Sequence, residues 1–140
     1  MGGTAIAIDV LVLDRLSKVG DTVNSSATHE MRGPMIHSIL RLAIPPRKMA
    51  EALGILTPMA ERIKVDPGCL GCHLYMDMLE KNVLMFEHLW RSEEDLKHHL
   101  RSNEYRCVLL LMEMALEQPE VRFDVIARTS GLETVELARS

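Results

Sequence analysis

Aromatic residues are scarce in this chain of 140 residues, at 4% of the sequence, with one Trp, two Tyr and two Phe. A platform on which nucleic-acid bases stack needs several exposed aromatic rings, so a site of this class is not expected. A basic excess is also lacking, because 16 Lys and Arg face 20 Asp and Glu, for a formal net charge of −4. Nucleic-acid binding depends on cationic side chains that displace counterions, so the sequence predicts no nucleic-acid partner.

Long hydrophobic runs are absent as well. No apolar segment approaches the roughly 20 residues that a membrane-spanning helix needs. The apolar stretch at residues 5–13 has no preceding Lys or Arg and contains Asp9, so it does not match a secretory signal. The three cysteines are too few, and odd in number, for a disulfide framework. We therefore expect no membrane partner and a reduced, cytoplasmic protein.

Motifs for the common cofactors are missing. The sequence contains neither a G-x-G-x-x-G fingerprint nor a phosphate-binding loop. Residues 69–73 spell the c-type haem attachment motif, but covalent haem attachment requires an exported chain, and no export signal is visible. Cys69 and Cys72 lack a second ligand pair at zinc spacing. The sequence predicts no cofactor and no metal, and it leaves the role of the Cys69/Cys72 pair open.

What is present suits one folded domain with extensions, because 47% of the residues are apolar and 26% are charged. Residues 1–34 are predicted to be an N-terminal arm whose apolar spacing favours a helix over a strand, followed by a turn-rich linker. Residues 35–128 are predicted to be the main domain. Residues 129–140 are predicted to be a tail, in which residues 134–138 are compatible with a short strand.

Within the main domain, hydrophobic periodicity changes between two and about 3.6 residues. The predicted strands are residues 35–44, 71–77, 83–90 and 121–128, and the predicted helices are residues 47–64 and 92–117, the latter with a break near residue 102. Pro58 is expected to kink or split the first helix, and Ser92 to Asp95 resemble a capping box that starts the second. This β-α-β-β-α-β order predicts an α+β, ferredoxin-like fold, a four-stranded antiparallel sheet with both helices on one face.

The predicted strands carry apolar residues on both faces. Leu40 alternates with Ile39 in the first strand, and Phe86 alternates with Met85 in the third. An antiparallel sheet with one face open to water alternates apolar with polar residues instead. The second face is therefore expected to be covered, and the simplest cover is a second copy of the sheet in a symmetric homodimer.

Several short motifs lie in a characteristic order on these elements. They are Pro67-Gly68-Cys69 before the second strand, Tyr75 within it, Trp90-x-Ser92 at the end of the third, and Leu96-x-x-His99-Leu100-x-Ser102 in the second helix. With these motifs, residues 35–128 resemble the antibiotic biosynthesis monooxygenase domain. The resemblance implies a dimeric α+β barrel with the two sheets face to face, and a small-molecule pocket between sheet and helices in each subunit. It also implies oxidation of a phenolic or quinol substrate by O2 without flavin, haem or metal.

Such an oxidation needs a dry pocket, an aromatic wall and a base, for which histidine is the natural residue. His99 matches a family position and is predicted to be the catalytic base, the alternative being a histidine bonded within its own helix. Trp90 is predicted to bind substrate as the pocket wall, the alternative being a packing residue that holds the helix on the sheet. His88 stands where family members often carry Glu, and it shares the strand face of Trp90, so it is the second catalytic candidate.

His37 and Arg41 share one face of the first strand, and with Tyr75 they complete the predicted substrate-binding set. If that face looks into the pocket, they can bind an anionic or phenolic oxygen, whereas near the sheet edge they are solvated. The expected partners are a small-molecule substrate, O2 and a second copy of the chain. Two other functions remain open, a non-catalytic small-molecule binding or stress module and an isomerase or lyase acting on a small hydroxyketone. A titratable residue buried beside an apolar cavity separates an enzyme from the non-catalytic module, and oxygen consumption separates an oxygenase from an isomerase.

Overall fold

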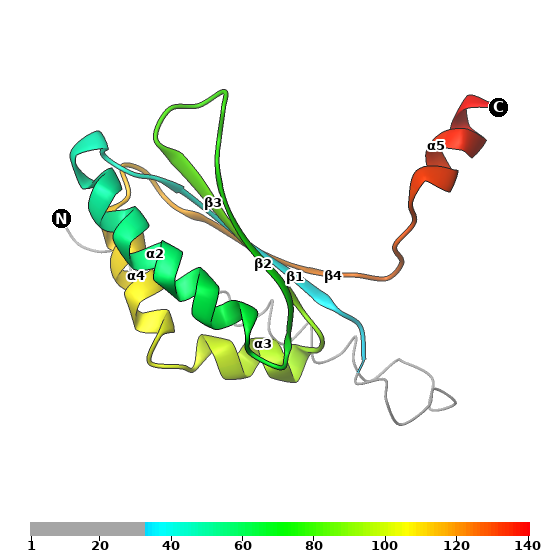
Figure 1. Ribbon diagram of the computed structural model, residues 1–140, viewed down its shortest axis with the longest axis horizontal. Helices are drawn as coiled ribbons and strands as arrows, with labels where there is room; N and C mark the ends of the chain where they lie inside the picture. Colours follow the sequence, from blue (N-terminus) through cyan, green and yellow to red (C-terminus); the bar gives the residue numbers. More distant parts are fainter. Residues whose placement is uncertain (1–32) are drawn as a thin grey trace.

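The computed structural model describes residues 33–140, so the helix and most of the linker expected in the N-terminal arm lie outside the described residues. The described elements are β1 (Ile36–Ala43), the short 3-10 helix η1 (Pro46–Lys48), α2 (Met49–Lys64), β2 (Cys69–Met76), β3 (Val83–Trp90), α3 (Glu93–Leu100), α4 (Tyr105–Met114), β4 (Glu120–Val125) and α5 (Leu132–Arg139) (Figure 1). Among these helices, none has the length and apolar character needed to cross a bilayer.

The four strands form one antiparallel sheet in the order β2-β3-β1-β4. Helices α2, α3 and α4 cover one face of this sheet, and among residues 33–140 no helix covers the other, which we call the open face (Figure 1). The predicted β-α-β-β-α-β order and the ferredoxin-like fold are confirmed. The second helix of the plan is divided at residues 101–104, close to the expected break.

The core lies between the sheet and the helices. In β1 and β3 the even-numbered residues face the helices, and the pairs Leu40 with Phe86 and Leu42 with Leu84 lie side by side in it. Helix α2 contributes a stripe at spacings of three and four residues, which is the period of one helix face. Its buried members are Ala52, Leu56, Met59, Ala60 and Ile63. Burial of this stripe holds α2 along its whole length on the sheet.

Pro58 does not divide α2, so the expected split is wrong. A proline inside a helix removes the N–H that would bond to the carbonyl four residues earlier, here the carbonyl of Gly54. Both Gly54 and Pro58 lie on the exposed side of the helix, where water can bond to that carbonyl. Meanwhile Leu56 and Met59, on either side of the proline, are buried in the same core. Packing therefore keeps the helix continuous.

The short strand expected at residues 134–138 is also wrong, because α5 occupies this segment. A strand satisfies its backbone groups only beside another strand, whereas a helix bonds its own N–H and C=O groups. After β4 the chain leaves the sheet, and within residues 33–140 no strand pairs with this segment (Figure 1). A helix is then the conformation that satisfies the backbone.

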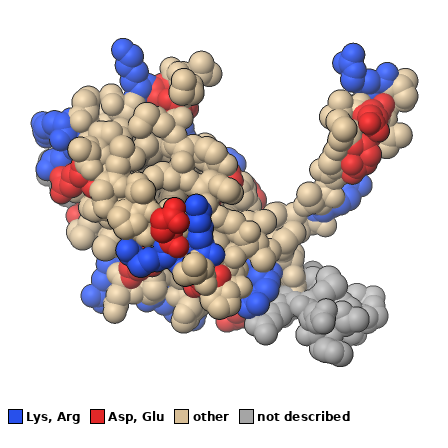
Figure 2. Space-filling model, in the orientation of Figure 1, with Lys and Arg blue, Asp and Glu red and all other residues tan. Residues whose placement is uncertain are grey.

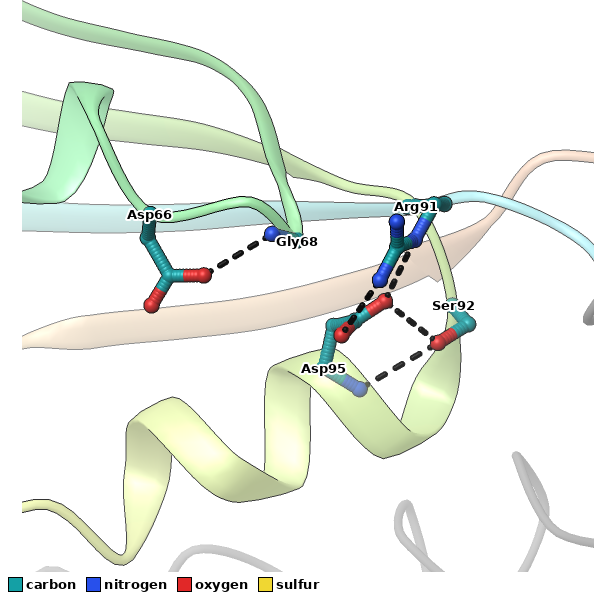
Figure 3. A network of polar contacts seen from close by, with 5 residues as sticks. All are labelled: Asp66, Gly68, Arg91, Ser92 and Asp95. Atoms are coloured by element: carbon teal, nitrogen blue, oxygen red, sulfur yellow. Dashed lines mark hydrogen bonds and ion pairs between the residues drawn. The ribbon is translucent and has the colours of Figure 1, made fainter.

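A polar network joins the start of β2 to the end of β3 and the start of α3 (Figure 3). Ser92 Oγ accepts the N–H of Asp95 at 3.2 Å and donates to its carboxylate at 2.8 Å, which confirms Ser92 as the residue that caps the start of α3. The Arg91 guanidinium donates to both oxygens of Asp95, at 3.0 and 3.2 Å. The Arg91 N–H also donates to the carbonyl of Gly68 at 2.9 Å. The network fixes where α3 begins and so sets the position of His99.

Gly68→Ala is expected to lower the free energy of unfolding by about 1–3 kcal/mol, the usual range for a forced overpacking. A Cβ at residue 68 would lie 2.5 Å from Cγ of Asp95, whose carboxylate Arg91 and Ser92 hold in place. Urea denaturation provides the measurement. The matched control is Gly54→Ala, which meets nothing within 4 Å and should stabilise the helix by up to about 1 kcal/mol. Equal losses in the two variants would contradict the clash.

Candidate functional site

Three of the predicted site residues meet in a buried aromatic cluster between the sheet and the helices. His88 and Trp90 project from β3 toward the helices, and His99 reaches them from α3. The ring of His99 stacks on Trp90, with centroids 4.7 Å apart and an interplanar angle of 27°, and its edge contacts His88 at 5.2 Å. Tyr105, at the start of α4, lies edge-on to His99 at 5.4 Å. His88, Trp90 and His99 are 4%, 0% and 5% exposed, so the cluster is shielded from solvent.

The cluster holds four buried nitrogen atoms that find no hydrogen-bond partner in the protein part described, residues 33–140. They are Nδ1 and Nε2 of His88, Nε2 of His99 and Nε1 of Trp90. Buried polar atoms are nearly always paired, and one left without a partner costs about 1–3 kcal/mol. Four such atoms in one place single this cluster out as the candidate functional site.

Burial sets the charge of this site. It lowers the pKa of His88 to about 3, with a smaller lowering from the neighbouring His99 and His37. It lowers the pKa of His99 to about 4, against the opposing pull of the Glu104 and Asp66 carboxylates. Both imidazoles are therefore neutral at pH 7, so each offers one N–H donor and one nitrogen acceptor. Burial also raises the pKa of Tyr105 to about 12, which keeps its phenol protonated.

The other three candidates lie on the opposite, open face of the sheet. His37 pairs with Leu89, and Arg41 and Tyr75 both pair with Met85, at positions that alternate with the helix-facing residues. His37 Nε2 lies 3.2 Å from Glu87, and Arg41 lies 2.6 Å from Glu80 and 3.7 Å from Asp77.

The six candidates therefore do not share one pocket, because a strand sends neighbouring side chains to opposite faces. The structure brings His88, Trp90 and His99 together and leaves His37, Arg41 and Tyr75 apart from them. The catalytic and substrate-binding roles of all six stay predictions.

A cavity of about 350 Å³ opens between α2 and the outer edge strand β2. It is lined from α2 by Thr57, Ala60, Glu61 and Lys64, and from β2 by Cys72, His73, Leu74 and Tyr75. Cys72 also pairs with His88, so the backbones of these two residues lie one strand spacing, about 5 Å, apart. Burial raises the pKa of the Cys72 thiol to about 12, which keeps it protonated.

A sequence model of the antibiotic biosynthesis monooxygenase family matches residues 35–108, more than half of the chain. The chain belongs to this family. No curated protein matches it significantly. Residues 33–140 of this family member contain no group of three or more His, Cys, Asp and Glu placed to hold a metal ion.

Solved structures from other organisms share the fold of this monooxygenase-family chain. A Caulobacter crescentus protein provisionally assigned as an antibiotic biosynthesis monooxygenase is 25% identical, with a TM-score of 0.62 over 68% of this chain and 92% of its own. A conserved protein of Methanosarcina mazei is 20% identical, with a TM-score of 0.61 over 66% of this chain and 92% of its own. A Nitrosomonas europaea protein, with the same provisional assignment as the first, is 12% identical, with a TM-score of 0.62 over 71% and 96%.

In this family member, Glu87 and His88, shortly before Trp90, lie on opposite faces of β3. His88, two residues before Trp90, faces the helices, whereas Glu87 points to the open face and pairs with His37. The carboxylate of Glu87 is therefore not part of the buried cluster.

Sequence reasoning missed one member of the cluster, Tyr105, and one residue beside it in the sheet, Ser38. Tyr105 was not among the candidates, although it follows the motif residue Ser102 by three positions, one helical turn. Ser38 was also missed; it pairs with His88 on the side opposite Cys72, so these three residues form one row across the sheet. No sequence signal identifies Ser38, because its place beside His88 depends on strand register.

Proposed function

We propose that this protein is a cofactor-independent monooxygenase that oxidises a phenolic or quinol-type small molecule with O2. The observation that carries the proposal is the set of buried imidazole and indole nitrogens without protein partners in the cluster of His88, Trp90 and His99. They lie in a shielded, aromatic site that suits a flat ring with polar substituents. Membership in the monooxygenase family supports the reaction class.

The chemistry begins with a proton transfer. A substrate ring lies against Trp90, and its hydroxyl donates to a neutral nitrogen of His99 or His88, which takes the proton as general base. The resulting anion passes one electron to O2, and the carbon radical and superoxide then combine in a new C–O bond. The peroxide regains the proton from the imidazolium and loses water, and the carbon keeps one oxygen as a carbonyl. The substrate loses two hydrogens in total, one from its hydroxyl and one from the oxidised carbon, and the second oxygen atom leaves in the water.

The low pKa values of His88 and His99 fit the return of the proton at the end of this cycle. An imidazolium buried beside Trp90 is unstable unless an anion lies next to it, so His88 and His99 become charged only while the substrate is ionised. The proton then returns readily to the peroxide. The cavity between α2 and β2 reaches Cys72, which pairs with His88 on the neighbouring strand.

The same low pKa values favour a second candidate, a non-catalytic small-molecule binding module. A group with a pKa near 3 or 4 is a weak base at pH 7, and it can serve only as a hydrogen-bond partner for a bound ligand. In that case the cluster binds flat polar rings and leaves them unchanged.

Oxygen uptake by the purified protein with a panel of anthrones, naphthols and hydroquinones tests the proposal. At least one compound is expected to give protein-dependent O2 uptake that persists with EDTA, and mass spectrometry should find a product with one oxygen gained and two hydrogens lost. Binding of the panel without uptake or product would support the binding module. A product of unchanged mass from a hydroxyketone without O2 uptake would identify an isomerase.

We also propose that the protein is a cytoplasmic homodimer in which two open sheet faces stack. Ile39, Met85 and Leu89 give this face an apolar centre beside the His37–Glu87 pair. Apolar side chains on an uncovered sheet face favour association, and a twofold axis places the same surface on both sides. The mixed composition also suits pairing, because charged groups set the register of two faces.

A further inference from the structure

Two apolar features project beyond the open face of the sheet. One is the turn between β2 and β3, where Met78 and Leu79 are 93% and 94% exposed. The other is α5, which has no buried residue and carries the exposed side chains of Leu132, Val135 and Leu137. Figure 1 places the turn and α5 at opposite ends of the sheet, both on the side away from α2, α3 and α4. The open face lies between them.

The turn presents its apolar residues from a rigid frame. The carboxylate of Asp77 accepts the backbone N–H groups of Leu79 and Glu80, at 2.8 and 3.1 Å. Arg41, from the open face of β1, pairs with the Glu80 carboxylate at 2.6 Å. A fixed turn therefore holds Met78 and Leu79 out toward solvent. Because the turn is already ordered, it loses little conformational entropy when a partner covers it.

Within residues 33–140, helix α5 buries none of its side chains against the rest of the chain. An isolated helix of fewer than about 12 residues is marginal in water, and α5 has 8 residues. Figure 2 shows it as a column that stands apart from the body, with much of its visible surface uncharged. Leu132 and Val135 lie one turn apart on one side of this helix, whereas Glu133 and Glu136 lie together on another. An amphipathic helix in this position needs an apolar surface to cover it.

We propose that the apolar side of α5 packs on the turn at Met78 and Leu79 of a second copy of this chain, once on each side of the dimer. This inference rests on the proposed stacking of open faces. A twofold axis that lies between the two open faces and runs across the strands exchanges the two ends of the sheet, so it brings α5 of one copy to the end of the sheet at which the other copy has its turn. The linking residues 126–131 span up to about 20 Å when extended, which gives α5 the reach to settle there.

Charge complements this pairing. Lys81 is exposed beside the turn, and Glu133 and Glu136 lie on α5 next to its apolar side. Opposite charges at the rim of an apolar contact orient the partners more than they add affinity. In this arrangement α5 and the turn cover each other's apolar side chains, and the dimer contains two identical contacts of this kind.

Sedimentation equilibrium of the full chain provides the test. Leu132→Ser with Val135→Ser, and separately Met78→Ser with Leu79→Ser, are each expected to raise the dimer dissociation constant about 10- to 100-fold, as loss of an apolar contact does. The variant that carries all four substitutions should raise the dissociation constant little more than either pair does. The two surfaces contact each other, so either pair of substitutions already removes the contact. The matched control is Val65→Ser, a residue 80% exposed at the end of α2, which should leave the constant unchanged.

Cross-linking adds a second readout. Under mild oxidation, Leu79→Cys with Val135→Cys in one chain is expected to give a covalent dimer on a non-reducing gel, and neither single variant should do so to the same extent. A wild-type dimer whose constant the serine pairs do not change would overturn this inference while leaving the stacked dimer standing. If the effects of the two serine pairs on the dissociation free energy were additive, the inference would also be overturned, since the two surfaces would then have different partners. A monomeric wild-type protein would overturn both the inference and the proposed dimer, and O2 uptake would still test the oxygenase separately.

Discussion

Acidification from about pH 7 to about pH 4.5 is expected to lower the free energy of unfolding by about 2 to 3 kcal/mol for each of His88 and His99. The pKa values of these two imidazoles are near 3 and 4 in the folded protein, below the 6.5 of an unperturbed histidine. The unfolded chain therefore binds more protons than the native chain below about pH 6.5. The full stability is present above that pH, falls as the pH decreases, and levels off only below the folded pKa values.

Urea denaturation at a series of pH values measures this effect. His88→Phe and His99→Phe should each flatten the pH dependence, because phenylalanine fills a similar space and leaves no buried group to protonate. His98→Gln is the matched control, since His98 is exposed on the same helix as His99. An unchanged slope in both phenylalanine variants would show that the acid sensitivity comes from groups outside the cluster.

Replacing His99 with phenylalanine is expected to lower kcat for O2 uptake about 100- to 10,000-fold, the usual contribution of a general base. The ring stack on Trp90 can persist in this variant, so substrate binding should change much less than turnover. His88→Phe should lower kcat to a similar degree if the proton passes through both imidazoles, and less if it only orients the substrate. Steady-state O2 uptake with the best compound of the panel gives kcat and KM for each variant.

The matched control for these variants is again His98→Gln, which is expected to keep the wild-type kcat. Rescue also discriminates, because added imidazole can replace a missing base but not a missing packing residue. Retention of uptake within a few-fold in both His88→Phe and His99→Phe would exclude the two imidazoles from proton transfer. The proposed reaction would then need another base.

Local sequence signals predicted much of the fold. The change of hydrophobic period located the four strands and the helices, because each period depends on side chains within a few residues of one another. The capping box at Ser92 was visible for the same reason, since its hydrogen bonds join residues three apart. The split of α2 at Pro58 was predicted wrongly, because core packing on both sides of the proline outweighs one lost backbone bond.

The sequence by itself determined that His88 and Trp90 share a strand face, because this relation depends only on the period of a strand. Tertiary structure alone decided which face of the sheet meets the helices. That choice follows from pairs such as Ser38 with His88, which join distant parts of the chain and bury the larger apolar face. It put His88, Trp90 and His99 in a dry cluster and left His37, Arg41 and Tyr75 on the open face. It also made residues 132–139 a helix, since no strand within the described residues 33–140 pairs with them.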